Sequence, residues 1–202
     1  MFNNSKKYLG FIKLLTVALL IAAIFFLWPR NLDKNGLNKT QLSDMGGDFV
    51  LQSSDGPVSL SDYKGKVVVL YFGYAYCPDV CPTSLGLLSQ ALGKLKPEEL
   101  SNVQALFISV DPERDTVEKL KKYAEAFHSN IKGVTGSPID IADVTSRYGA
   151  SYMKVEIPNS ALGYAVDHSS KYYLINRNGK LNKLVDHGTS PNNIVAALRA
   201  ML

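Results

Sequence analysis

The chain contains two cysteines, Cys77 and Cys81, which are separated by three residues and are each followed by proline. Thiolates are nucleophiles and soft metal ligands, so a close pair can exchange electrons as a disulfide or bind a metal. The spacing is one residue longer than the redox motif Cys-x-x-Cys, and a peroxidatic cysteine with a resolving partner fits two such close cysteines poorly. Outside the cytoplasm, an inert structural disulfide is the usual alternative.

A metal site would need at least one further ligand besides the two sulfurs. Two thiolates with one imidazole suit copper, whereas a closed structural zinc site requires four protein ligands. The chain has three histidines, His128, His168 and His187. His128 follows a predicted helix end, where the helix dipole favours an imidazolium, and we expect it at the surface. His168 and His187 lie in predicted loops, each beside an aspartate, and sequence spacing does not choose between them.

The elements around the cysteines predict a strand that leads into a helix. Residues 67–72 form an apolar, β-branched run typical of a buried strand, and leucines recur with helical spacing after Pro82. Proline is favoured in the first helical position. We therefore expect Cys81 at the N-cap of this helix and Cys77 in the preceding loop. A helix N-terminus stabilises thiolates through its free N–H groups and its dipole.

The rest of the chain predicts an α/β domain of the thioredoxin-like, three-layer type with an N-terminal β-hairpin. A β-α-β half precedes a β-β-α half, and its continuous apolar strands suit a sheet covered on both faces. Sites in such sheets lie at the carboxyl ends of the strands, where the cysteines are. The predicted elements are a hairpin over 49–60, strands over 66–72, 103–110, 131–135 and 152–157, helices over 82–95, 116–127, 138–148 and 191–201, and a hairpin over 171–185.

The loop of residues 111–116, Asp-Pro-Glu-Arg-Asp-Thr, precedes the predicted helix over 116–127. Asp115 with Glu118 three residues later fits a capping box, which we expect to be its role. Arg114 is expected to form a local ion pair. Asp79 lies between the cysteines and could tune metal affinity, face a partner or simply shape the loop.

Three segments divide the chain. Residues 8–28 are apolar apart from Lys13 and Thr16, long enough to span a bilayer, and end in bulky residues rather than a cleavage site. We expect a signal anchor over residues 1–30, a linker over 31–45 and the domain over 46–202. The net charge of +4, without a cluster of basic residues, excludes a nucleic-acid-binding surface.

The segment YFGYAYCPDVCPTSL, followed by DPERDT and then DHSS, resembles the Sco/SenC family of membrane-anchored, thioredoxin-like copper proteins. The resemblance implies that Cys77, Cys81 and His168 bind Cu(I) or Cu(II). It also implies a chaperone, not an enzyme, that delivers copper to the binuclear site of cytochrome c oxidase. A thiol–disulfide oxidoreductase or redox sensor using the Cys77/Cys81 pair, with a thiol reductant as partner, is the alternative. For the location we expect a bacterial inner membrane, with the domain facing the periplasm.

Overall fold

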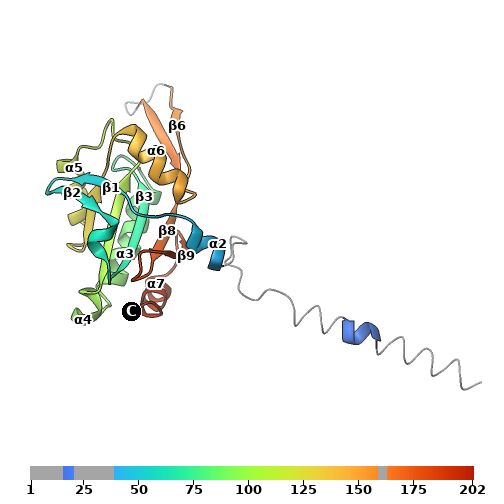
Figure 1. The fold of residues 1–202 in the computed structure, drawn as a ribbon. Coiled ribbons are helices and arrows are strands. Elements are labelled where there is room, and N and C mark those ends of the chain that lie inside the picture. Colours follow the sequence, from blue (N-terminus) through green and yellow to red (C-terminus); the bar gives the residue numbers. More distant parts are fainter. Residues whose placement is uncertain (1–15, 21–38, 159–162) are drawn as a thin grey trace, which may run out of the picture. The chain divides into compact units, whose positions relative to one another are not determined.

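The computed structural model describes residues 16–20, 39–158 and 163–202 (Figure 1). The chain divides into two units, residues 1–36 and 37–202. In the first unit, residues 16–20 are helical and exposed. Among the described residues, no helix has both the length and the apolar character that a membrane crossing requires. Apart from residues 16–20, the expected membrane anchor lies outside the described part of the chain.

A five-stranded sheet forms the centre of the second unit. Its strands, in spatial order, are β5 (Ile131–Val134), β4 (Val103–Ser109), β3 (Val67–Gly73), β8 (Lys171–Ile175) and β9 (Leu181–Asp186). The first three are parallel to one another, and β8 is antiparallel to both of its neighbours. All seven residues of β3 are buried. Its continuous apolar sequence follows from this, because a strand covered on both faces has no polar side.

Three helices cover one face of this sheet: α3 (Val80–Leu92), α5 (Val117–Glu125) and α7 (Pro191–Arg199). Tyr71 of β3 donates a hydrogen bond to Ser84 of α3 at 3.1 Å. Phe107, which is aligned with Tyr71 on β4, packs against Tyr123 of α5 with ring centroids 5.3 Å apart. Helix α7 packs beside α3.

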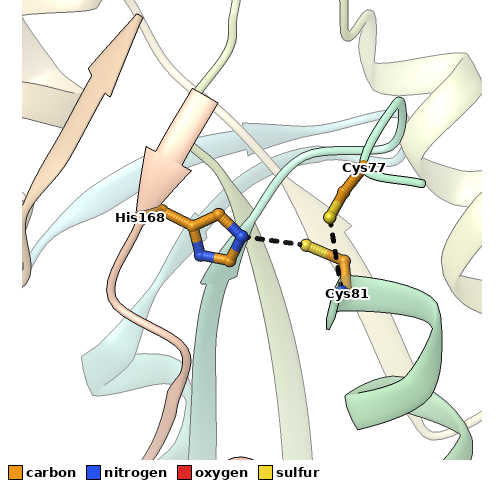
Figure 2. A group of neighbouring side chains, drawn as sticks. All are labelled: Cys77, Cys81 and His168. Atoms are coloured by element: carbon orange, nitrogen blue, oxygen red, sulfur yellow. Dashed lines mark hydrogen bonds between the residues drawn. The ribbon is translucent and has the colours of Figure 1, made fainter. Parts of the chain in front are cut away.

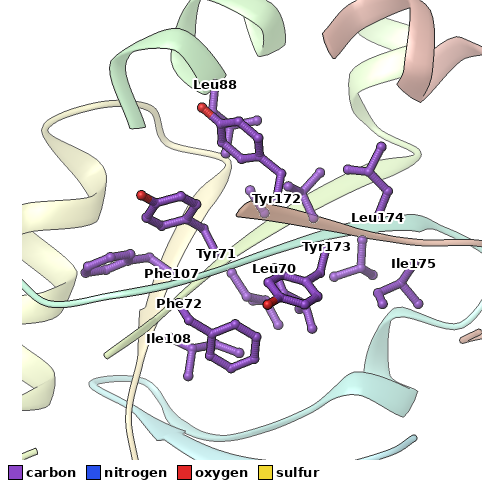
Figure 3. Packing of buried hydrophobic residues seen from close by; sticks show 14 of the residues in the cluster. Leu70, Tyr71, Phe72, Leu88, Phe107, Ile108, Tyr172, Tyr173, Leu174 and Ile175 are labelled. Carbon is purple, nitrogen blue, oxygen red and sulfur yellow. The ribbon is translucent and has the colours of Figure 1, made fainter. Parts of the chain in front are cut away.

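The opposite face is covered by helix α6 (Pro138–Arg147) and the hairpin of β1 (Val50–Ser53) and β2 (Gly56–Ser59). Phe72 and Phe49 both pack against Tyr148 at the end of α6, with centroids 6.1 and 6.2 Å apart. Figure 3 shows Tyr71 and Tyr172 on one side of the strands and Phe72 and Tyr173 on the other. The predicted three-layer arrangement with an N-terminal hairpin is therefore present.

A second antiparallel pair, β6 (Tyr152–Glu156) and β7 (Tyr164–His168), lies outside the central sheet. The strand over 152–156 was predicted, but the prediction of a loop over 164–168 was wrong. Val166 is buried while its neighbour Asp167 is exposed, as alternation along a strand requires. The polar run that follows Val166 hides this alternation in the sequence. His168 is consequently the last residue of a strand.

The domain begins earlier than the sequence suggests. Helix α2 (Lys39–Asp44) lies within the predicted linker, and it contacts β9. Its Leu42 is only 2% exposed. The expected boundary at residue 46 is thus corrected, because residues 39–44 pack on the domain instead of spacing it. Two further short elements, a 3₁₀-helix over Leu60–Tyr63 and α4 (Pro97–Leu100), were not predicted.

Candidate metal centre

The two cysteines are presented where β3 passes into α3. A turn over residues 74–79 connects the two elements, and α3 begins at Val80 with Asp79 as its N-cap. Cys81 is therefore the second residue of the helix. The prediction that Cys81 is the N-cap was wrong by two positions. Pro82 is the third residue, and its missing N–H costs nothing there, because the first turn of a helix leaves those donors without intrahelical partners.

His168 meets the cysteines from the end of β7, as Figure 2 shows. The Sγ atoms of Cys77 and Cys81 and a ring nitrogen of His168 all lie within 4.8 Å of one another. The Cys81 Sγ and His168 Nε2 atoms are 3.3 Å apart. The Cys81 backbone N–H donates to Cys77 Sγ at 3.4 Å. Three residues from segments up to 91 positions apart in the sequence thus form one cluster.

The cluster has the size of a three-coordinate metal site. For metal–sulfur and metal–nitrogen bonds of about 2.3 and 2.0 Å, ligands at 120° lie about 3.7–4.0 Å apart. The observed separation of 3.3 Å between Cys81 Sγ and His168 Nε2, and the limit of 4.8 Å for the whole set, bracket that spacing. Small side-chain rotations would bring all three donors to one ion. Two thiolates and one imidazole are a donor set that suits copper.

The two thiols have opposite electrostatic environments. A hydrogen bond from Cys81 lowers the pKa of Cys77 well below that of an ordinary thiol, and this outweighs partial burial; His168 also contributes. The same hydrogen bond raises the pKa of Cys81, and burial raises it further. Cys77 is therefore the thiolate of the pair, and Cys81 retains its proton in the absence of metal. A metal ion that binds both sulfurs would displace that proton.

The imidazole of His168 is held in one orientation. Its Nδ1 lies 3.3 Å from the carbonyl oxygen of Ser169. A carbonyl oxygen can only accept, so Nδ1–H donates there, and Nε2 is the ring nitrogen that faces the sulfurs and would bind a metal. The rings of Tyr71 and Tyr74 stand nearly perpendicular to the imidazole, with centroids 6.3 and 5.9 Å away. These aromatic contacts restrict rotation of the ligand.

The other two histidines are not in the cluster. His187 is exposed and follows β9. His128 lies beyond α5 and is half-buried; its Nδ1 accepts the N–H of Asn130 at 3.0 Å, and burial lowers its pKa. The expected imidazolium at a surface position is thus not favoured for His128. The structure places His168 beside the sulfurs, which sequence spacing alone could not predict.

Asp115 does not cap a helix, contrary to the prediction. The N-cap of α5 is Thr116, whose side chain accepts the N–H of Lys119. The carboxylate of Asp115 is buried and accepts hydrogen bonds from the Ala75 N–H at 2.8 Å and from the Ser109 hydroxyl at 2.7 Å. Asp115 therefore fixes the turn that carries Cys77. The DPERDT motif was the sequence signal, but its contact with Ala75 spans 40 residues and leaves no local pattern.

Comparison with known proteins identifies the family of this domain. The SCO1/SenC family model matches residues 38–202. The SCO1 homolog 1 of Arabidopsis thaliana, a mitochondrial protein, is 44% identical over 132 residues, which is 65% of this chain. The match spans 39% of the length of that relative.

Two solved structures share the fold at useful sequence identity. The structure of Bradyrhizobium japonicum ScoI with copper bound has a TM-score of 0.71 and 36% identity, over 78% of this chain and 99% of that one. BsSco is described as a member of the Sco family of cytochrome c oxidase assembly proteins with a disulfide switch. It has a TM-score of 0.62 and 28% identity, over 79% of this chain and 94% of that one. The expected Sco-type, thioredoxin-like α/β fold is thereby confirmed.

Proposed function

The chain belongs to the SCO1/SenC family, and on this basis we propose that it is a copper-binding chaperone that delivers copper to the binuclear copper site of cytochrome c oxidase. Cys77, Cys81 and His168 would be the copper ligands. The observation that carries the proposal is the convergence of two sulfurs and one imidazole nitrogen within 4.8 Å. Copper bound to the related Bradyrhizobium protein supports the choice of metal.

The donor set suits a metal that must be handed on. Thiolates favour Cu(I), and a third ligand from imidazole completes a trigonal site. Cu(II) could be held by the same residues with an added oxygen ligand. Cys81 is fully buried, whereas Cys77 is partly exposed. An incoming ligand from the copper-site subunit of the oxidase would therefore replace Cys77 first. Such ligand exchange transfers the metal and transforms no substrate chemically.

For the location, we propose a single membrane-spanning segment over residues 8–28 and a domain on the periplasmic side of a bacterial inner membrane. Support comes from the apolar length of that segment, which exceeds the roughly 20 residues that a span requires. The chain between this segment and α2 would hold the copper site away from the bilayer. The domain would then meet its proposed partner, the copper-site subunit of the oxidase, on the periplasmic side of that membrane.

A comparison of ligand variants tests the proposed function. Reduced protein should retain one copper ion per chain, and His168→Ala should weaken copper binding and change the absorption spectrum of the copper-loaded protein. The matched control is His187→Ala, which should behave as wild type because His187 is exposed and outside the cluster. Cys77→Ala or Cys81→Ala should lower copper retention further. Reduced wild-type protein without stoichiometric copper would refute the proposal.

The proximity of the two sulfurs also favours a second function, that of a thiol–disulfide oxidoreductase or redox sensor. The two thiols would lose two protons and two electrons to the disulfide of an oxidised partner, which would be reduced to two thiols. The disulfide switch of BsSco supports this alternative. Insulin reduction by the reduced, copper-free protein distinguishes the two functions. Turnover without copper retention would favour the oxidoreductase, and copper retention without turnover the chaperone.

A further inference from the structure

One loop contacts both arms of the metal centre. The cysteines follow β3 of the central sheet, whereas His168 ends β7 of the separate two-stranded sheet. A sheet of only two strands is marginally stable by itself, so other contacts must fix its position. The loop of residues 111–116, which follows β4, supplies contacts to both arms.

The first set of contacts holds the strand that carries the histidine. The carboxylate of Asp111, which is fully buried, accepts the Nε–H of Arg114 and, at 2.8 Å, the hydroxyl of Tyr164. The Nη1–H of Arg114 donates to the carbonyl oxygen of Tyr164 at 2.9 Å. The guanidinium also stacks on the Tyr164 ring, 3.6 Å from its centroid. Both the backbone and the side chain of the first residue of β7 are thus fixed.

The second set of contacts holds the turn that carries the cysteines. Asp115 accepts the N–H of Ala75, two residues before Cys77, and forms an ion pair with Lys119 at 3.3 Å. The Lys119 ammonium lies 3.1 Å from the centroid of the Tyr76 ring. Two acidic residues of one loop thus contact different arms of the site: Asp111 contacts the histidine strand and Asp115 the cysteine turn.

We propose that Asp111, Arg114 and Tyr164 form a latch that positions His168 as the third copper ligand. The latch rests on the proposed copper-binding function and extends it to residues that do not touch the metal. The latch acts through β7, which begins at Tyr164 and ends at His168. Because the strand is a short, extended segment, fixing the position of Tyr164 also fixes the position of His168.

When Tyr164 loses its contacts, Asp115 still holds the cysteine turn, so the thiolates remain in place and the imidazole is displaced. The Arg114 guanidinium also lies 5.6 and 5.2 Å from the centroids of the Tyr74 and Tyr76 rings in that turn. Tyr164→Phe is therefore the variant that acts on the histidine side alone.

Arg114→Lys and Tyr164→Phe test the latch. Lysine keeps the charge but loses the planar, two-point contact, and phenylalanine keeps the ring but loses the hydroxyl that Asp111 accepts. The matched control is Arg147→Lys, since Arg147 likewise bridges a carboxylate, Asp143, and a backbone carbonyl, that of Asp48 at 2.7 Å, away from the site. In copper-free protein, amide hydrogen exchange over residues 163–168 should accelerate in both latch variants and stay unchanged in the control.

The copper-specific readout is a double-mutant cycle with His168→Ala. Disturbing outer contacts of a metal ligand typically weakens binding about 10–100-fold, and we expect at least a tenfold loss of Cu(I) affinity in each latch variant. In the His168→Ala background the same substitutions should change affinity by less than about twofold, because the ligand they position is gone. An equal loss in both backgrounds, or no loss in either, would overturn the latch. Failure of wild-type protein to bind copper would instead overturn the proposed function, and the exchange measurement would still report on the latch.

Discussion

At the residue scale, the two thiols of the site differ in exposure and in protonation. Cys77 is partly exposed and carries the lowered pKa, and Cys81 is buried and carries the raised one. The difference arises because the Cys81 thiol donates a hydrogen bond to the Cys77 thiolate, and the Cys81 backbone N–H does so as well. A site of this kind has one sulfur that reacts with partners and one that remains in the interior.

We therefore predict that iodoacetamide modifies Cys77 before Cys81 in reduced, copper-free protein. A lowered pKa means that the thiolate already exists at acidic pH, so the rate should change little between about pH 6 and about pH 8. The rate for an ordinary thiol, with a pKa of about 8.5, rises steeply over that range. Peptide mass spectrometry locates the label. A label found first on Cys81, or a rate that follows an ordinary thiol, would contradict the assignment.

Gly73 lets β3 end directly against the buried sulfur. A Cβ atom at this position would lie 2.6 Å from Cys81 Sγ and 2.9 Å from the Phe107 ring. Gly73→Ala should therefore displace the sulfur, lower copper affinity and reduce the free energy of unfolding by about 1–3 kcal/mol. Gly86→Ala is the control: nothing lies within 4 Å of its Cβ position, and alanine in a helix should stabilise by about 0.5–1 kcal/mol. Chemical denaturation and copper titration measure both effects.

The sequence predicted the sulfur ligands but not the choice of histidine. Cys77 and Cys81 stand out because they are the only two cysteines of the chain, and the strand and helix around them have clear periodicities. His168 and His187 both follow apolar stretches and both neighbour an aspartate. Which of them reaches the sulfurs depends on the pairing of β7 with β6, a tertiary event without a local signal. The family resemblance supplied that choice.

At the element scale, the loop of residues 111–116 shows why local patterns misassign buried polar residues. Asp115 and Thr116 are both good N-cap residues, and Glu118 completed a capping box with Asp115. In the structure, the cap is Thr116, because the Asp115 carboxylate is committed to Ser109 and Ala75. Burial of a carboxylate requires such partners. Here Ser109 comes from the end of β4 and Ala75 from the turn that carries the cysteines, so the helix pattern around Asp115 does not reveal them.

Thr116→Ala and Asp115→Ala should separate the two roles. Loss of the cap should reduce the free energy of unfolding by about 1 kcal/mol and leave copper affinity unchanged. Loss of Asp115 leaves the Ala75 N–H and the Ser109 hydroxyl without their acceptor, and should cost at least about 2 kcal/mol. It should also weaken copper binding, because the cysteine turn loses its anchor. Equal stability losses with unchanged copper affinity in both variants would restore Asp115 to a capping role.

At the scale of the whole molecule, the metal centre and helix α2 lie against different strands of the central sheet. The cysteine turn lies at the carboxyl end of β3, as expected for a sheet of this type. Helix α2 contacts β9, the strand at the far edge of the sheet from β5. Helix α2 thus contacts a strand that contributes no ligand to the metal centre.

This arrangement predicts that α2 contributes to stability and not to copper binding. Leu42 is 2% exposed, and Leu42→Ala should reduce the free energy of unfolding by about 2–5 kcal/mol, as large-to-small substitutions in a core do. Ile139 has the same size but is 80% exposed, so Ile139→Ala should change stability by no more than about 0.5 kcal/mol. Copper affinity should stay at the wild-type value in both. If Leu42→Ala were as mild as Ile139→Ala, α2 would belong to the linker and the domain would begin near residue 46. If it lowered copper affinity as well, β9 would transmit strain to the site, and α2 would not be independent of metal binding.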